Sequence, residues 1–224
     1  MKKDFKEIFP NTKFTKKYHI TAEVLNSVTH GIGVVLAIIG MIFLFLKAYN
    51  HQSWLEFIAY FIYGCGLFTL YLSSTLYHSF TFTKARNIFR IFDHSSIFIL
   101  IAASYTPFMI LGLANTLGYT ILAIIWILAV LGVTTQAIKI NQPKRRGAVW
   151  LYLLMGWMVI FAIRPITQIL NAQGFWLLVA GGLSYSFGII FYALSKRVKF
   201  AHTIWHLFVL AGSITMYFAI YYSL

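Results

Sequence analysis

The chain has 224 residues, of which 60% are hydrophobic and only 10% are charged, and its formal net charge is +13. A soluble domain contains about 25% charged residues, so this composition excludes an ordinary soluble protein and indicates a polytopic membrane protein. The basic residues lie between apolar segments, which favours the lipid bilayer rather than nucleic acid as partner. The single cysteine, Cys65, excludes an intramolecular disulfide.

Apolar segments predict an all-α fold, a bundle of seven transmembrane helices. A span needs about 20 mostly apolar residues, and the predicted spans are 23–46, 54–78, 90–112, 116–138, 148–163, 175–195 and 202–223. The fifth is the shortest, and we expect Arg164-Pro165 to end it. Residues 1–20 are predicted to form a basic tail, and residues 21–224 a single transmembrane domain.

The distribution of Lys and Arg predicts the orientation. All but two of the 18 basic residues lie in the N-terminal tail or in the connections after even-numbered spans, and the exceptions are Lys47 and Arg164. Cytoplasmic segments carry the excess of Lys and Arg. We therefore expect a cytoplasmic N-terminus and an outside C-terminus, an arrangement that requires an odd number of spans.

Two histidines, His202 and His206, open the last apolar segment. Residues four apart share one face of a helix, so both imidazoles can bind one metal ion. His78 ends the second span on the same side of the membrane. Three imidazoles with an open fourth position are typical of catalytic zinc, so we predict Zn²⁺ at His78, His202 and His206. The alternative is that these are interfacial histidines that face lipid headgroups or end a helix.

Asp93 and Ser74 are the predicted catalytic residues at this depth. Asp93, at the start of the third span, could hold a water on the metal and take its proton; alternatively, it caps the helix. Ser74 lies one turn before His78, where its hydroxyl could orient that water or donate to a developing oxyanion. Alternatively, Ser74 bonds to its own helix backbone. His94 lies about 100° around the helix from Asp93, so we leave it out of the ligands.

Glu23, Asn26 and His30 share one face of the first span, because they are spaced three and four residues apart. They could form a polar stripe that faces the bundle interior. We expect a structural hydrogen-bond network that joins the first span to its neighbours, and direct participation in catalysis is the alternative.

Four motifs extend across most of the chain: Glu23-x-x-Asn26-x-x-Thr29-His30, Ser74-x-x-x-His78, Asp93 and His202-x-x-x-His206. Together they resemble the signature set of the PAQR (progestin and adipoQ receptor) family. Two further segments resemble most closely the bacterial hemolysin III branch: Phe92-Asp93-His94-Ser95-Ser96-Ile97 and Tyr105-Thr106-Pro107-Phe108. The resemblance covers about residues 20 to 222.

This resemblance implies seven helices with a cytoplasmic N-terminus, in a bacterial plasma membrane. It implies zinc on the histidines that match His78, His202 and His206, with Asp93 in contact with the zinc-bound water and Ser74 one turn before the first ligand. Because the wider superfamily includes alkaline ceramidases, it also implies a membrane lipid amide as substrate and a role in membrane lipid homeostasis.

The sequence is compatible with three functions. The first is a zinc-dependent intramembrane hydrolase that acts on a ceramide-like lipid amide. The second is a membrane-lytic or pore-forming hemolysin, which the sequence supports less, because the polar groups gather at one end rather than along a channel. The third is a non-catalytic, zinc-stabilised membrane sensor, in which Asp93 would close the metal site as a fourth ligand.

Overall fold

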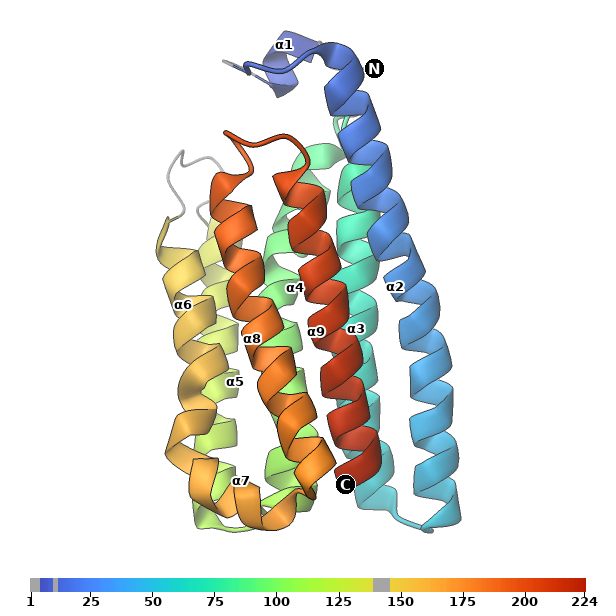
Figure 1. Cartoon of the computed structure of the whole chain (residues 1–224), viewed down its shortest axis with the longest axis vertical. Coiled ribbons are helices and arrows are strands. Elements are labelled where there is room, and N and C mark those ends of the chain that lie inside the picture. Colours follow the sequence, from blue (N-terminus) through green and yellow to red (C-terminus); the bar gives the residue numbers. More distant parts are fainter. Residues whose placement is uncertain (1–4, 10–11, 139–145) are drawn as a thin grey trace.

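Helices make up every regular element of the described residues, 5–9, 12–138 and 146–224, in this computed structural model (Figure 1). Seven of the described helical segments are long and apolar enough to cross a membrane, as predicted. The elements are α1 (Phe5–Ile8), α2 (Lys16–Asn50), α3 (Trp54–Ser79), α4 (Arg86–Pro107), the π-helical η1 (Phe108–Gly112), α5 (Thr116–Ile138), α6 (Arg146–Trp157), the 3₁₀-helical η2 (Met158–Ala162), α7 (Ile163–Ile169), α8 (Ala172–Leu194) and α9 (Ala201–Ser223).

Polar side chains fix the starts of three spans. The Thr15 hydroxyl accepts a hydrogen bond from the Tyr18 amide at the start of α2, and Ser53 caps α3 in the same way. The side-chain oxygen of Asn171 accepts a bond from the Gly174 amide at the start of α8. Such caps satisfy amide groups that have no partner within the helix.

Two predicted boundaries are wrong. The first span begins at Lys16 rather than at residue 23, and its 35 residues extend about 52 Å, which exceeds the 40–45 Å of a whole bilayer. The fifth span does not end at Arg164-Pro165, because it continues through η2 and α7 to Ile169. Pro165 lies in the first turn of α7, where a missing backbone N–H disrupts no helical hydrogen bond.

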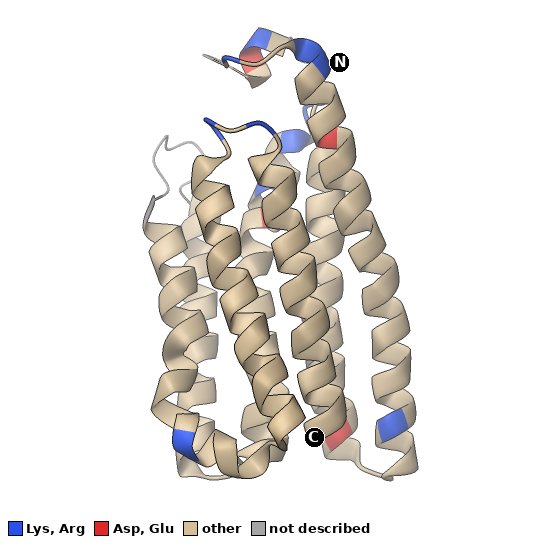
Figure 2. Ribbon diagram, viewed as in Figure 1, with Lys and Arg blue, Asp and Glu red and all other residues tan. Residues whose placement is uncertain are grey.

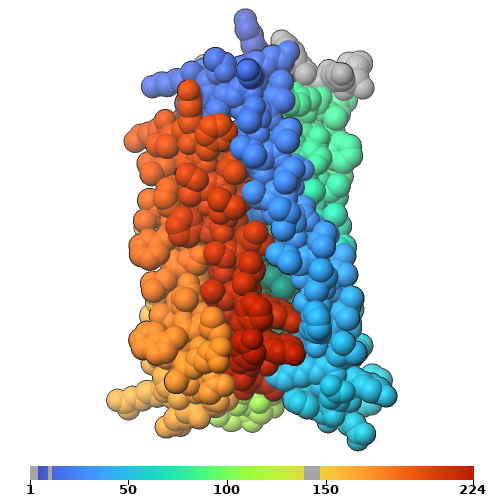
Figure 3. Space-filling model, turned by 45° about the vertical axis from the view of Figure 1, so that its right-hand side comes forward, coloured from blue at the N-terminus to red at the C-terminus, as the bar shows by residue number. Residues whose placement is uncertain are grey.

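The spans form a closed bundle in which sequential helices are neighbours. Contacts join α2 to α3, α3 to α4, α4 to α5 and α8 to α9, and α9 packs back against α2. The space-filling view shows α2 in blue running beside α9 in red (Figure 3). The third span is the most buried, with 67% of its apolar window inside the bundle. Consequently, side chains from α2, α3, α4 and α9 can meet in the interior.

A glycine allows α2 to lie close to α3 near the polar stripe. A Cβ atom at Gly33 would collide with the ring of Tyr71. The missing side chain therefore admits this ring, whose edge also contacts His30 at a centroid distance of 5.1 Å.

The Lys and Arg residues gather at the end of the bundle that carries the N-terminus, and few lie at the opposite end (Figure 2). This end also holds the loop between α8 and α9 and the C-terminal end of α3. Basic residues of the described chain are thus concentrated at one end of the bundle. This asymmetry is the basis for predicting a cytoplasmic N-terminus.

Candidate metal centre

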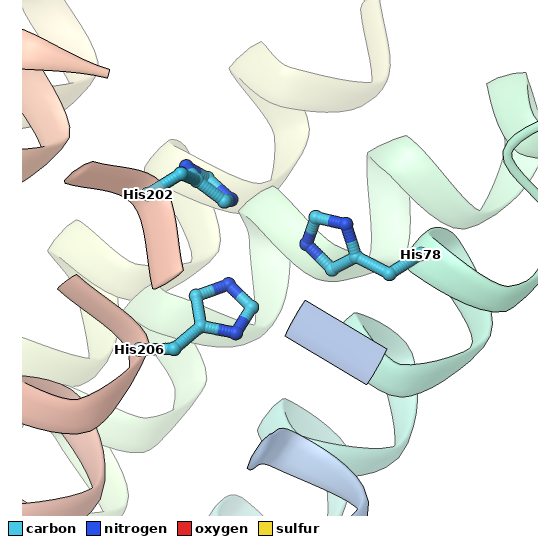
Figure 4. A group of neighbouring side chains, drawn as sticks. All are labelled: His78, His202 and His206. Carbon is cyan, nitrogen blue, oxygen red and sulfur yellow. The ribbon is translucent and has the colours of Figure 1, made fainter. Parts of the chain in front are cut away.

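Three histidines from two helices converge at the basic end of the bundle. His202 and His206 lie in the first two turns of α9, and His78 lies at the end of α3. One ring nitrogen of each lies within 4.8 Å of the others. The ring centroids are 4.8 to 5.2 Å apart, and Figure 4 shows the rings turned toward a common point. This group could hold one metal ion.

The Glu23 carboxylate orients the His78 ring. His78 Nδ1 donates to Glu23 Oε2 at 2.6 Å, and the Thr81 hydroxyl donates to the same oxygen at 3.0 Å. A neutral imidazole that donates through Nδ1 has its lone pair on Nε2. His78 therefore presents Nε2 toward the other two histidines as a potential ligand.

The backbone of α2 orients His206 in a similar way. His206 Nδ1 lies 3.2 Å from the Asn26 carbonyl oxygen, which can only accept, so Nδ1 carries the proton. The Thr29 hydroxyl lies 3.3 Å from the same nitrogen. The Asn26 side chain accepts a hydrogen bond from the Thr203 hydroxyl at 2.5 Å, which joins α2 to α9 beside His206.

These residues fit a divalent metal ion. Within the described part of the chain, Nε2 of His78 and Nε2 of His206 are buried and have no hydrogen-bond partner. Histidine ligands of metals donate their other N–H to a carboxylate or a backbone carbonyl, which is the arrangement of these two rings. Three imidazoles suit zinc, although copper, iron and nickel also accept imidazole.

Burial argues against the alternative of interfacial histidines. His206 is fully buried and His78 is 4% exposed, so neither ring faces lipid headgroups. His202 is partly buried and contacts the indole of Trp205 at a centroid distance of 4.9 Å.

The positions of Ser74 and Asp93 argue against the structural roles considered for them, which are a bond to the helix backbone for Ser74 and a helix cap for Asp93. Among the described residues, the Ser74 hydroxyl is buried without a partner, so it does not bond to its own helix backbone. Asp93 cannot cap α4, because α4 begins at Arg86, about two turns earlier. Its Oδ2 lies 3.3 Å from His94 Nδ1. The Asp93 side chain lines a small pocket that His202 also lines.

The polar stripe of α2 reaches both helices that carry the grouped histidines. Glu23 contacts α3, Asn26 contacts α9, and His30 stacks on His206 with 3.6 Å between ring centroids and 12° between planes. These contacts join the first span to α3 and α9, through hydrogen bonds at Glu23 and Asn26 and through a ring stack at His30.

Two threonines that support the histidines, Thr81 and Thr203, are not predicted by the sequence pattern. Thr81 follows the candidate ligand His78 by three residues, and Thr203 lies between the two histidines of α9. Both threonines lie close to the histidines in the sequence, which could have indicated a role. Their hydrogen bonds to Glu23 and Asn26, however, link different spans and depend on how those helices pack.

An apolar cavity of about 240 Å³ begins beside the centre. His30 and Asp93 line one end, and Met109 of η1 and Met216 of α9 line parts farther along the bundle. Asp93 and Met109 are separated by about 24 Å at 1.5 Å per residue. The cavity therefore extends over most of the roughly 30 Å hydrocarbon core of a bilayer.

Comparisons with known proteins agree on one family. The model of the family described as haemolysin-III related matches residues 18–217. A hemolysin-3 homolog of Bacillus subtilis (strain 168) is 44% identical over 205 residues, covering 91% of this chain and 94% of the relative. Hemolysin-3 of Bacillus cereus is 43% identical, covering 93% and 92%. The human monocyte to macrophage differentiation factor is 31% identical, covering 88% and 82%.

Proposed function

Since this chain belongs to the haemolysin-III related family of membrane proteins, we propose that it is a zinc-dependent intramembrane hydrolase that cleaves a ceramide-like lipid amide. One observation carries the proposal: His78 and His206 direct unpartnered, buried Nε2 atoms toward His202 beside a long apolar cavity. The histidines supply the ligands, and the cavity offers room for an acyl chain.

An open metal site supports hydrolysis over a purely structural role. Structural zinc sites are closed by four protein ligands, whereas catalytic sites leave one position open. The group found among the described residues has three histidines and no carboxylate. A divalent ion bound there would polarise a carbonyl and ease the deprotonation of water.

The remaining polar groups fit the proton transfers of amide hydrolysis. The Asp93 carboxylate would accept a proton from the attacking water as the oxygen–carbon bond forms. It would then return that proton to the leaving nitrogen as the carbon–nitrogen bond breaks. The Ser74 hydroxyl, buried and unpartnered among the described residues, would donate to the carbonyl oxygen as it gains negative charge.

The substrate would enter from the cytoplasmic leaflet of the plasma membrane. This part of the proposal depends on the distribution of basic residues, which favours a cytoplasmic N-terminus, and the histidines lie at that end of the bundle. An acyl chain in the cavity would extend toward the opposite leaflet. Hydrolysis at this depth would alter the lipid composition of the membrane.

The test is hydrolysis by purified protein in lipid nanodiscs. The wild type and His206→Ala are incubated with ceramide, and free fatty acid and sphingoid base are measured by mass spectrometry. We expect equimolar release of both products by the wild type and none above background by the variant. Equal release by both proteins, or none by a metal-loaded wild type, would contradict the proposal.

The names of the bacterial relatives support membrane lysis as a second candidate function, since one is called hemolysin-3 and the other a hemolysin-3 homolog. Specific lysis would require the same folded protein to release a dye from liposomes. If His206→Ala and the wild type release dye equally, the effect is non-specific disruption by a hydrophobic protein. Release that depends on intact His206 would favour this second candidate.

A further inference from the structure

His30 is a fourth histidine next to the candidate metal centre, and it is not one of the three that are grouped there. It is 2% exposed. One face of its ring stacks on His206, and the edge of Tyr71 packs against it. The ring is therefore held in one orientation by aromatic contacts from α9 and α3.

Both ring nitrogens of His30 are available for a ligand. Neither makes a hydrogen bond to another residue in the described ranges. One ring nitrogen approaches a backbone group of His206 in a contact that falls short of hydrogen-bond geometry. A neutral imidazole has one N–H donor and one lone-pair acceptor, and buried polar groups of this kind are normally bonded. The unused donor and acceptor indicate a partner that is not part of the folded chain.

The cavity identifies where that partner would lie. His30 lines the cavity at the end nearest the metal centre, together with Asp93. Other polar side chains in the lining already use their hydroxyls in hydrogen bonds to protein atoms: Ser104, Tyr105, Tyr152, Tyr185 and Ser186. His30 therefore differs from these neighbours in having hydrogen-bonding capacity to spare.

We propose that His30 is a substrate-binding residue that hydrogen-bonds the amide or the adjacent hydroxyl of a lipid whose acyl chain occupies the cavity. The inference rests on the proposed function, because it takes a lipid amide as the occupant. The imidazole N–H donates to the carbonyl or hydroxyl oxygen, and the other nitrogen accepts from the amide N–H or the hydroxyl. His30 thus fixes the polar group of the lipid next to the metal ligands.

The test compares lipid binding by two variants. His30→Phe keeps an aromatic ring against His206 but removes both nitrogens, and the matched control Tyr63→Phe removes another buried, unpartnered polar atom that does not line the cavity. Binding of a pyrene-labelled ceramide and a pyrene-labelled alkane is measured by energy transfer from tryptophan, because Trp157 and Trp205 line the cavity. Zinc content is measured on each sample.

We expect His30→Phe to bind the ceramide probe about tenfold more weakly, as for the loss of a buried hydrogen bond, and to bind the alkane with unchanged affinity. Zinc content should match the wild type, and Tyr63→Phe should bind both probes normally. Unchanged ceramide affinity in His30→Phe would overturn the inference while leaving the proposed function intact. Loss of zinc would also overturn it, because the ring would then serve only to support His206. A wild type that does not prefer ceramide to the alkane would overturn both proposals.

Discussion

Removal of the Glu23 carboxylate should weaken metal binding without removing a ligand. Its Oε2 accepts from His78 Nδ1 at 2.6 Å and from the Thr81 hydroxyl at 3.0 Å, and the side chain is 14% exposed. A hydrogen bond to a charged group contributes about 1.5–3 kcal/mol, which corresponds to about 10- to 100-fold in affinity. Loss of such supporting groups typically lowers metal affinity by about the same factor.

The variants Glu23→Ala and Glu23→Gln test this reasoning, with zinc Kd measured by competition against a chelating dye at constant pH. Glu23→Ala should bind zinc about 10- to 100-fold more weakly, and Glu23→Gln should lie between it and the wild type, because the amide oxygen can still accept from His78. Glu56→Ala is a matched control, since Glu56 also bonds a histidine, His51, at a distance from the centre. Equal zinc affinity in Glu23→Ala and Glu56→Ala would refute the orienting role.

Three further predictions concern catalysis, packing and orientation. Ser74→Ala should lower the rate of ceramide hydrolysis by about 10²- to 10³-fold with zinc content unchanged, and a normal rate would remove Ser74 from the mechanism. Gly118→Ala should destabilise the protein by about 1–3 kcal/mol in detergent unfolding, because a Cβ there would collide with the Leu113 carbonyl oxygen. Gly147→Ala, where a Cβ would meet nothing within 4 Å, should be neutral or stabilising, and equal stability of the two variants would contradict the packing. Alkaline phosphatase fused to the C-terminus should be active in a bacterial host and a fluorescent protein fused there should be dark, whereas the reverse pattern would invert the proposed orientation.

Hydropathy predicts the number of spans because each crossing requires a long apolar segment, whatever its tertiary contacts. It does not locate helix ends that depend on polar chemistry. The helix α2 begins in a basic segment because Thr15 caps it, and a window of apolar residues cannot detect such a cap. The fifth span passes Pro165 because a tightened 3₁₀ turn, η2, leads into a new first turn that tolerates proline.

The candidate site could be predicted in part because His202 and His206 share a face of one helix, and helical spacing is visible in a sequence. Their approach to His78 depends on α9 packing beside α3, which the sequence pattern indicates only through the common depth of the polar groups. The bond from His78 to Glu23 and the stack of His30 on His206 join different spans. Side-chain orientation between helices determines these contacts, and no local motif encodes it.

Metal analysis of purified protein tests the central claim most directly. The wild type and the double variant His202→Ala/His206→Ala are purified in detergent without chelators, their folding is verified by circular dichroism, and bound metals are measured by mass spectrometry. The account predicts about one zinc per chain in the wild type and none in the double variant. A folded wild type without bound metal, or a double variant that keeps the same zinc content, would contradict it.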